Sequence, residues 1–287
     1  MTHAPANPPQ ELPPEDWAGE MGTRWLAKID RFESMIAPIG AALLARAQYG
    51  AGETVVDVGC GGGATSLQIA SAVGPDGSVV GIDISPDLTA KATQRAAAAK
   101  VSNVRFQCAD AATWRPERLL GRLFSRFGAM FFPDPAAAFT NLHQCLEPGG
   151  RIDLAVWGPP RDNLWMMEMM AVVRRHVEVP PAVPRAPGPF AFEDVDYLNA
   201  ILATAGFRGT DIHAHTGLQP VGGAGASPRE AVSFALSSLA AGRMLESQST
   251  TLRQAVEDDL MALFERNHLP GQGVMMKGKA WLISAKA

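Results

Sequence analysis

The chain has 287 residues, of which 47% are hydrophobic and 19% charged, and this ordinary globular usage excludes a disordered or fibrous chain. The 25 Lys and Arg residues against 29 Asp and Glu residues give a formal net charge of −4, so no overall basic field favours nucleic acid or an anionic membrane surface as a partner. The three cysteines form no CxxC pair. The sequence contains no run of about 18 apolar residues, which is the length that a helix needs to cross a bilayer. We therefore expect a cytoplasmic protein without a disulfide framework or a cysteine zinc cluster.

The first fifty residues divide into a tail and a helical segment. Residues 1–16 are rich in proline and are predicted to form a disordered tail, because proline fixes φ and lacks an N–H donor. Apolar residues at helical spacing follow between residues 17 and 50, and Pro38 interrupts them. The pattern predicts two helices, and we expect them to form a lid.

Residues 51–158 alternate short β-branched runs with amphipathic segments. Strands are predicted at 54–59, 78–84, 104–110, 123–132 (with a turn) and 151–158, and helices at 64–73, 85–100 and 135–147. This alternation is typical of a doubly wound α/β sheet with helices on both faces. We expect this segment to be the cofactor-binding core.

The pattern changes over residues 159–287. A Met-rich helix at 163–179 and a Pro-rich crossing at 180–189 predict a helical insertion after the fifth strand. Further helices are predicted at 192–206, 227–240 and 251–267, and strands at 210–221 and 280–287. The two strands would complete a seven-stranded, mostly parallel, Rossmann-like sheet.

The most informative stretch is the glycine-rich loop between the first predicted strand and helix, with Gly59, Gly61 and Gly63. Glycines let backbone N–H groups approach a ligand, and the helix N-terminus adds partial positive charge. The loop also fits the loose dinucleotide pattern, a weak signal that leaves an NAD-dependent oxidoreductase as an alternative. Asp57 favours another ligand, because its carboxylate would oppose a pyrophosphate and can accept hydrogen bonds from an ammonium group.

Two more carboxylates end the next predicted strands. Asp83 follows the second strand, where an acidic side chain can accept from both ribose hydroxyls. Asp110 follows the third, where its carboxylate could accept from an adenine amine while the Ala111 N–H faces a ring nitrogen. Three carboxylates in this order indicate a nucleoside joined to an amino acid.

The segments VVDVGCGGGATSLQIA, VVGIDIS, CADAATW, FSRFGAMFF and LEPGGRI resemble the class I S-adenosylmethionine-dependent methyltransferases, specifically a bacterial small-molecule group. The resemblance implies three groups of cofactor contacts: Asp57, Gly59, Gly61 and Gly63 around the methionine moiety; Asp83 and Ile84 at the ribose and adenine; and Asp110, Ala111 and Ser125 at the adenine and the end of strand four. No NPPY-like motif follows strand four, which disfavours a nucleic-acid base methylase.

The expected activity is methyl transfer to a small apolar or aromatic metabolite, with an oxygen acceptor favoured over nitrogen or carbon and S-adenosylhomocysteine as the product. No metal is expected, and no catalytic residue is assigned among the histidines. An apolar lid is expected from aromatic and Met side chains on both sides of the site: Trp17, Trp25, Phe32, Met35, Trp165, Met166, Met167, Met169 and Met170. The first alternative is a protein of the same fold that binds the cofactor but transfers no methyl group. The chain could also form a homodimer.

Overall fold

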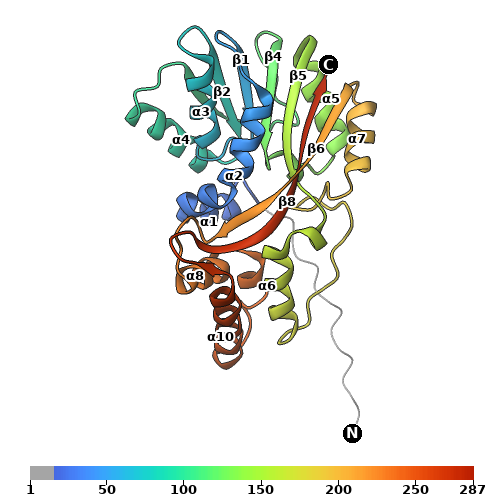
Figure 1. Ribbon diagram of the computed structural model, residues 1–287. Coiled ribbons are helices and arrows are strands. Elements are labelled where there is room, and N and C mark those ends of the chain that lie inside the picture. The colour runs from blue at the N-terminus through green and yellow to red at the C-terminus, as the bar shows by residue number, and fades with distance from the viewer. Residues whose placement is uncertain (1–15) are drawn as a thin grey trace.

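The computed structural model describes residues 16–287, so the predicted tail lies outside the described residues except for Asp16. Its centre is one sheet with seven strands in the order β3-β2-β1-β4-β5-β8-β6, to which β7 adds a short pairing with β8 (Figure 1). The strands are β1 (Thr54–Val58), β2 (Ser78–Asp83), β3 (Val104–Cys108), β4 (Leu120–Arg126), β5 (Leu146–Trp157), β6 (Arg208–Val221), β7 (His268–Leu269) and β8 (Gly273–Lys286).

Strands β1 to β5 pair in parallel, and β8 pairs antiparallel with both β5 and β6. Nearly every residue of β1 and β2 is buried, as expected for strands covered on both faces. The predicted doubly wound, mostly parallel Rossmann-like sheet is confirmed. In this order the carboxyl ends of β3, β2 and β1 lie side by side at one edge.

Helices cover both faces of the sheet. Helices α3 and α4 contact β1, β2 and β3, while α5 and α7 contact each other and the β5 and β6 side. The helices are α1 (Glu20–Ala27), α2 (Ile29–Ala47), α3 (Ala64–Val73), α4 (Pro86–Ala98), α5 (Pro135–Gln144), α6 (Leu164–Arg174), α7 (Val195–Thr204), α8 (Pro228–Ser238), α9 (Ala240–Arg243) and α10 (Thr250–Arg266), with 3-10 turns η1 (Ala129–Phe131) and η2 (Pro160–Asp162).

Strands β6 and β8 are longer than predicted. They pair over most of their length, and Figure 1 shows them curving out of the parallel sheet toward α6, α8 and α10. The prediction started the last strand at residue 280, but β8 begins at Gly273 because pairing with β6 continues through the Lys277 and Lys279 positions. A second helical insertion, α8 to α10, therefore stands between the last two long strands of the sheet.

The two N-terminal helices meet at Lys28, not at Pro38 as expected. Pro38 lies inside α2, which continues through it for another nine residues. Proline loses only one helix hydrogen bond there, and the buried side chains of Ile36, Ile39 and Leu43 hold the helix against the core.

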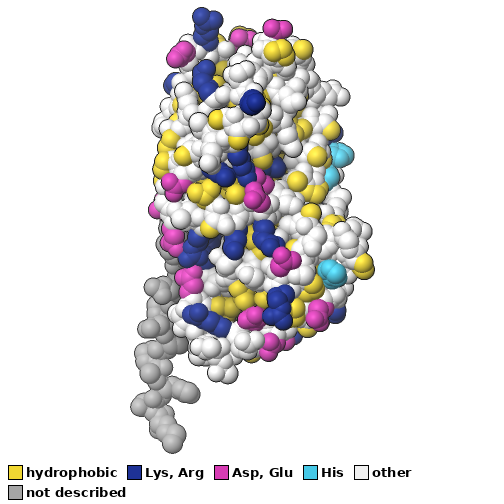
Figure 2. All heavy atoms as spheres, turned by 90° about the vertical axis from the view of Figure 1, so that its left-hand side faces the viewer, with side chains coloured by type: hydrophobic (Ala, Val, Ile, Leu, Met, Phe, Trp, Pro, Cys, Tyr) yellow, Lys and Arg dark blue, Asp and Glu magenta, His cyan; other side chains and the backbone are white. Residues whose placement is uncertain are grey.

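Ion pairs fix these helices to the rest of the molecule. Arg24 pairs with Glu246, Arg31 with Glu230, and Arg95 with Glu33. Figure 2 shows basic and acidic side chains interspersed over the face that it presents, with apolar side chains between them. Within residues 16–287, no helix has the length and apolar content needed to cross a bilayer.

Candidate active site

The glycine loop joins β1 to α3 at the carboxyl edge of the sheet. Gly59 has φ +67°, and a Cβ placed there would stand 2.7 Å from the Cα of Gly128, just after β4. Only glycine combines this left-handed backbone with so close an approach. The loop therefore lies directly against the segment that follows β4.

Asp57, at the end of β1, is fully buried. Its Oδ2 accepts hydrogen bonds of 2.7 Å from the hydroxyls of both Thr65 and Ser66, in the first turn of α3. Its Oδ1 is buried and has no hydrogen-bond partner among residues 16–287. An orphaned carboxylate oxygen beside a glycine loop fits the ammonium group of S-adenosylmethionine. The sequence reasoning missed Thr65 and Ser66, whose position in the helix that follows the loop was the available signal.

Burial raises the pKa of Asp57 from 3.8 to about 6, and the Ser66 and Thr65 hydroxyls partly oppose the rise. The folded-state pKa lies above the unfolded value, so the charged form of Asp57 lowers the free energy of unfolding. This loss of stability is absent below about pH 3.8 and complete above about pH 6. We expect the Asp57→Asn variant to gain stability relative to wild type by roughly 3 kcal/mol as pH rises through this window. Paired denaturant titrations of the two proteins between pH 4 and pH 7 measure this difference.

The same shift predicts how ligand binding depends on pH. An ammonium group beside Oδ1 favours the ionised carboxyl, so S-adenosylhomocysteine affinity falls below about pH 6 in wild type. The Asp57→Asn variant binds more weakly, and its affinity changes less than that of wild type through this window. Calorimetric titrations from pH 5 to pH 8 test this, and equal pH dependence in both proteins would remove Asp57 from the site.

Two backbone N–H groups hold the side chain of Asp83, which lies at the end of β2, beside the glycine loop. Its Oδ2 accepts from the Gly61 N–H at 2.8 Å and its Oδ1 from the Ser85 N–H at 2.9 Å. Burial raises its pKa, and these backbone donors oppose the rise. The structure thus brings Asp83 and Gly61 together, as the predicted site requires.

The adenine-side residues differ in exposure. Ile84 is 44% exposed, an unusual position for a large apolar side chain and one suited to covering a flat ring. Asp110 is exposed and its Oδ1 accepts from the Ala112 N–H at 2.9 Å, while Ala111 is buried and its carbonyl accepts from Asn141. All three follow neighbouring strands β2 and β3, on the edge that carries Asp83.

Ser125, expected among the cofactor contacts, lies within β4. Its hydroxyl is buried and donates to the Val58 carbonyl at 2.8 Å, so it ties β4 to β1. Phe127, two residues further along the chain, adopts a positive φ of +63°, which is unusual for a residue other than glycine. A bulky buried residue in the left-handed region is strained, and such strain gathers at functional sites.

Arg31 and Arg126 differ in their contacts. Arg31 pairs with Glu230 and donates to the Gly222 carbonyl. Arg126 forms no hydrogen bond or ion pair with the residues that the structure describes. Burial lowers its pKa, and the charges of Asp57 and Glu33 oppose this effect. Arg126 thus holds an uncommitted guanidinium close to the glycine loop.

The candidate histidines offer no base at this edge. His176 bonds to Asp259 at 2.7 Å, and His143 packs edge-on against Phe207. His213 and His215 lie on the same face of β6, where burial lowers the pKa of His215. In the described part of the chain, no group of three or more His, Cys, Asp or Glu side chains is arranged to hold a metal ion.

Aromatic side chains line two sides of the carboxyl edge. On one side Trp17 packs edge-on against Trp25 and Phe131, and Trp25 stacks on Phe32 at 3.9 Å. The indole N–H of Trp17 is buried without a partner among the described residues.

On the other side Phe127 stacks on Trp157 at 4.3 Å, and Trp157 meets Trp165 at 5.1 Å. Arg95 fixes α2 to the loop, since it pairs with Glu33 and donates to the Gly62 carbonyl at 3.0 Å.

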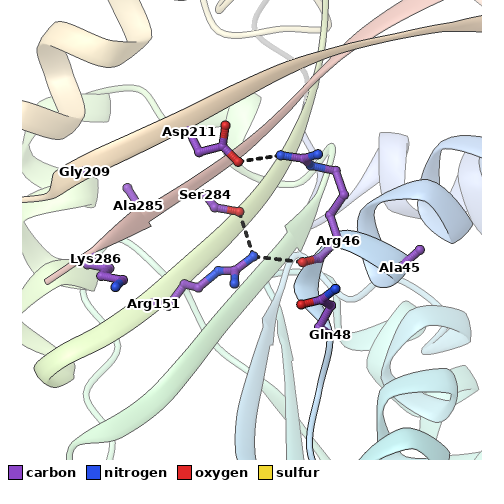
Figure 3. Close-up of a pocket in the computed structure, with 9 residues that line it drawn as sticks. All are labelled: Ala45, Arg46, Gln48, Arg151, Gly209, Asp211, Ser284, Ala285 and Lys286. Atoms are coloured by element: carbon purple, nitrogen blue, oxygen red, sulfur yellow. Dashed lines mark hydrogen bonds and ion pairs between the residues drawn. The ribbon is translucent and has the colours of Figure 1, made fainter.

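Cavities are found at the opposite edge of the sheet. One of about 400 Å³ lies between the amino end of β5 and the carboxyl end of β8 (Figure 3). There Arg46 pairs with Asp211 at 2.5 Å, while Arg151 donates to Ser284 and to the Arg46 carbonyl (Figure 3). A larger one of about 950 Å³ is lined by the first residues of β1, β2 and β4. Neither cavity contacts the glycine loop, so we place the site at the carboxyl edge on the chemistry of its residues.

Comparison with known proteins agrees with this geometry. The methyltransferase domain family matches residues 55–150. The chain is 38% identical over 134 residues to a trans-aconitate 2-methyltransferase of Methylobacterium radiotolerans, with 47% of this chain and 48% of that protein covered. It is 34% identical over 116 residues to an aklanonic acid methyltransferase of a Streptomyces species, with 40% and 53% covered. The chain thus matches about half the length of these curated relatives.

A solved structure extends the likeness in fold. Phosphoethanolamine N-methyltransferase 2 of Haemonchus contortus, in complex with S-adenosyl-L-methionine, superposes with a TM-score of 0.57 at 16% identity. The match covers 94% of this chain and 59% of that one. At residues 55–150 the chain thus carries a methyltransferase domain, set in a sheet of strand order β3-β2-β1-β4-β5-β8-β6.

Proposed function

We propose that the whole protein transfers a methyl group from S-adenosylmethionine to a small molecule with an aromatic or apolar body, with an oxygen acceptor favoured. The observation that carries the proposal is the buried, unpartnered Oδ1 of Asp57 beside a loop whose Gly61 N–H is bound by Asp83. Together these residues supply the contacts that an amino acid joined to a nucleoside needs.

When bound, S-adenosylmethionine supplies a sulfonium methyl group that reacts by in-line displacement. The role of the protein is to orient the donor and the acceptor and to exclude water from the site. Asp57 and the loop would hold the amino-acid end, Asp83 the ribose, and Ile84, Asp110 and Ala111 the adenine. Residues 17–50, our proposed lid, would bring Trp17 and Trp25 over the acceptor.

The acceptor class follows from the side chains around this edge. The two aromatic groups favour a ring system, since such side chains contribute large apolar area with defined packing geometry. The uncommitted guanidinium of Arg126 fits a carboxylate, either on the cofactor or on the acceptor. Support comes from the relatives, because trans-aconitate and aklanonic acid are both acids by name.

Calorimetric titration of the purified chain with S-adenosylhomocysteine, with NAD as the control ligand, tests the cofactor part of the proposal. We expect one-to-one binding of S-adenosylhomocysteine and none of NAD. Incubation with S-adenosylmethionine and a panel of aromatic hydroxy acids, read by mass spectrometry for a gain of one methylene, then tests transfer. Binding without transfer to any panel member would favour a cofactor-binding protein with another role.

A further inference from the structure

Two buried side-chain amides, those of Asn163 and Gln219, lie close together beside α6. They differ in how many hydrogen-bond partners their polar atoms have. Asn163 is fully buried and donates to the carbonyls of Gly158, Pro159 and Lys279 while accepting from the Lys279 N–H and the Trp165 indole. Gln219 on β6 is also fully buried. Neither its Nε2 nor its Oε1 has a hydrogen-bond partner within residues 16–287.

Gln219 belongs to the inner face of the β6–β8 ribbon. Its cross-strand partner is the buried Met276, whereas the next residue back, Leu218, is exposed. A Cβ placed on Gly278 would stand 2.8 Å from Cγ of Gln219 and 3.3 Å from Cδ1 of Trp165. The Gln219 side chain and the Trp165 indole therefore lie against the same point of β8, at Gly278.

Trp165 links Gln219 to the carboxyl edge of the sheet. Its ring meets Trp157, which stacks on Phe127, and Gly128 after it touches the glycine loop at Gly59. A chain of ring contacts thus leads from the segment beside the glycine loop to Trp165, which shares the neighbourhood of Gly278 with Gln219.

A purely structural role does not account for this side chain. A buried amide without partners is unfavourable, and most buried polar atoms in folded proteins are paired. Methionine has nearly the same length and shape, so packing alone does not require an amide at this position. An amide presents a donor and an acceptor next to each other, and it is best matched by a ligand group that does the same.

We propose that Gln219 binds the far end of the methyl acceptor and selects acceptors that carry a donor and an acceptor side by side, such as a carboxamide or an adjacent hydroxyl and carbonyl. The aromatic body of the acceptor lies along Phe127, Trp157 and Trp165. This inference rests on the proposed function and adds the acceptor's chemical class to it.

The first test is the stability of the Gln219→Met variant without ligand. Since the substitution removes two unsatisfied polar atoms at nearly constant volume, we expect its melting temperature to rise by about 2 °C or more. Gln254→Met, on the exposed face of α10, serves as the control and should leave the melting temperature unchanged. A fall in the melting temperature of Gln219→Met would show that the amide has partners in the folded protein and would overturn the inference.

The second test is binding of two matched probes in the presence of saturating S-adenosylhomocysteine: 2-naphthamide, and 2-acetonaphthone, in which a methyl replaces the amide nitrogen. We expect wild type to bind 2-naphthamide at least 5-fold more tightly, and Gln219→Met to bind both equally, while all proteins bind S-adenosylhomocysteine alike. Equal probe affinities in wild type, or a preference that survives in Gln219→Met, would overturn the inference and leave the cofactor site intact. Failure of wild type to bind S-adenosylhomocysteine would instead contradict the proposed function.

Discussion

Replacing Gly61 with valine is expected to abolish S-adenosylhomocysteine binding while the sheet stays folded. Gly61 has φ +54°, and a Cβ built on it meets no atom of the protein within 4 Å. The new side chain would therefore project into space that the protein leaves open beside the loop. That space is where the methionine end of the ligand must approach the backbone, so we expect the dissociation constant to rise at least 100-fold.

Gly52→Val is the matched control for this prediction. Gly52 also has a positive φ, +84°, with nothing within 4 Å of a Cβ, but it lies before β1 at the opposite edge. Both variants place a β-branched residue in the left-handed region and should lose about 1–2 kcal/mol of stability. Only Gly61→Val should lose binding in calorimetry. If it binds within 3-fold of Gly52→Val, the loop is not the ligand site.

The sequence predicted the parallel core well because that core depends on local signals. Short β-branched runs such as residues 54–58 are typical of strands covered on both faces, and the glycines after them mark the turn into a helix. The carboxylates Asp57 and Asp83 could be placed because each ends one of these strands. Parallel strands bring their carboxyl ends to the same edge, so order along the chain predicted proximity in space.

The parts that were not predicted depend on partners far along the chain. Residues 273–279 contain two lysines and two glycines, and they form a strand because β6 supplies a paired register. Helix α2 continues through Pro38 because its buried face packs on the core. Gln219 stands between Leu218 and Pro220 and gave no signal in the sequence, since its burial depends on the packing around the curved β6–β8 ribbon.

Removing the carboxylate of Asp83 is the second substitution with a large expected effect. Asp83→Ala leaves the N–H groups of Gly61 and Ser85 without their acceptor and removes the group that would accept from the ribose hydroxyls. Hydrogen bonding to a charged acceptor contributes about 1.5–3 kcal/mol, so affinity for S-adenosylhomocysteine should fall by about 10- to 150-fold. Asp194→Ala is a matched control, because Asp194 likewise accepts from two backbone N–H groups, those of Asp196 and Tyr197, at the start of α7.

A second ligand separates ribose recognition from organisation of the loop. If Asp83 binds the ribose, wild type should bind the 2′,3′-dideoxy analogue of S-adenosylhomocysteine much more weakly than the parent compound, whereas Asp83→Ala should bind the two alike. For each protein, the ratio of its affinities for the two ligands converts to a free-energy difference. The gap between these two free-energy differences is the coupling energy between the carboxylate and the hydroxyls, and a general loosening of the loop does not contribute to it. A variant that still discriminates between the ligands as wild type does would mean that Asp83 acts only by holding the Gly61 and Ser85 backbone. The affinity lost in Asp83→Ala would then measure loop order, and the hydroxyls would need another acceptor.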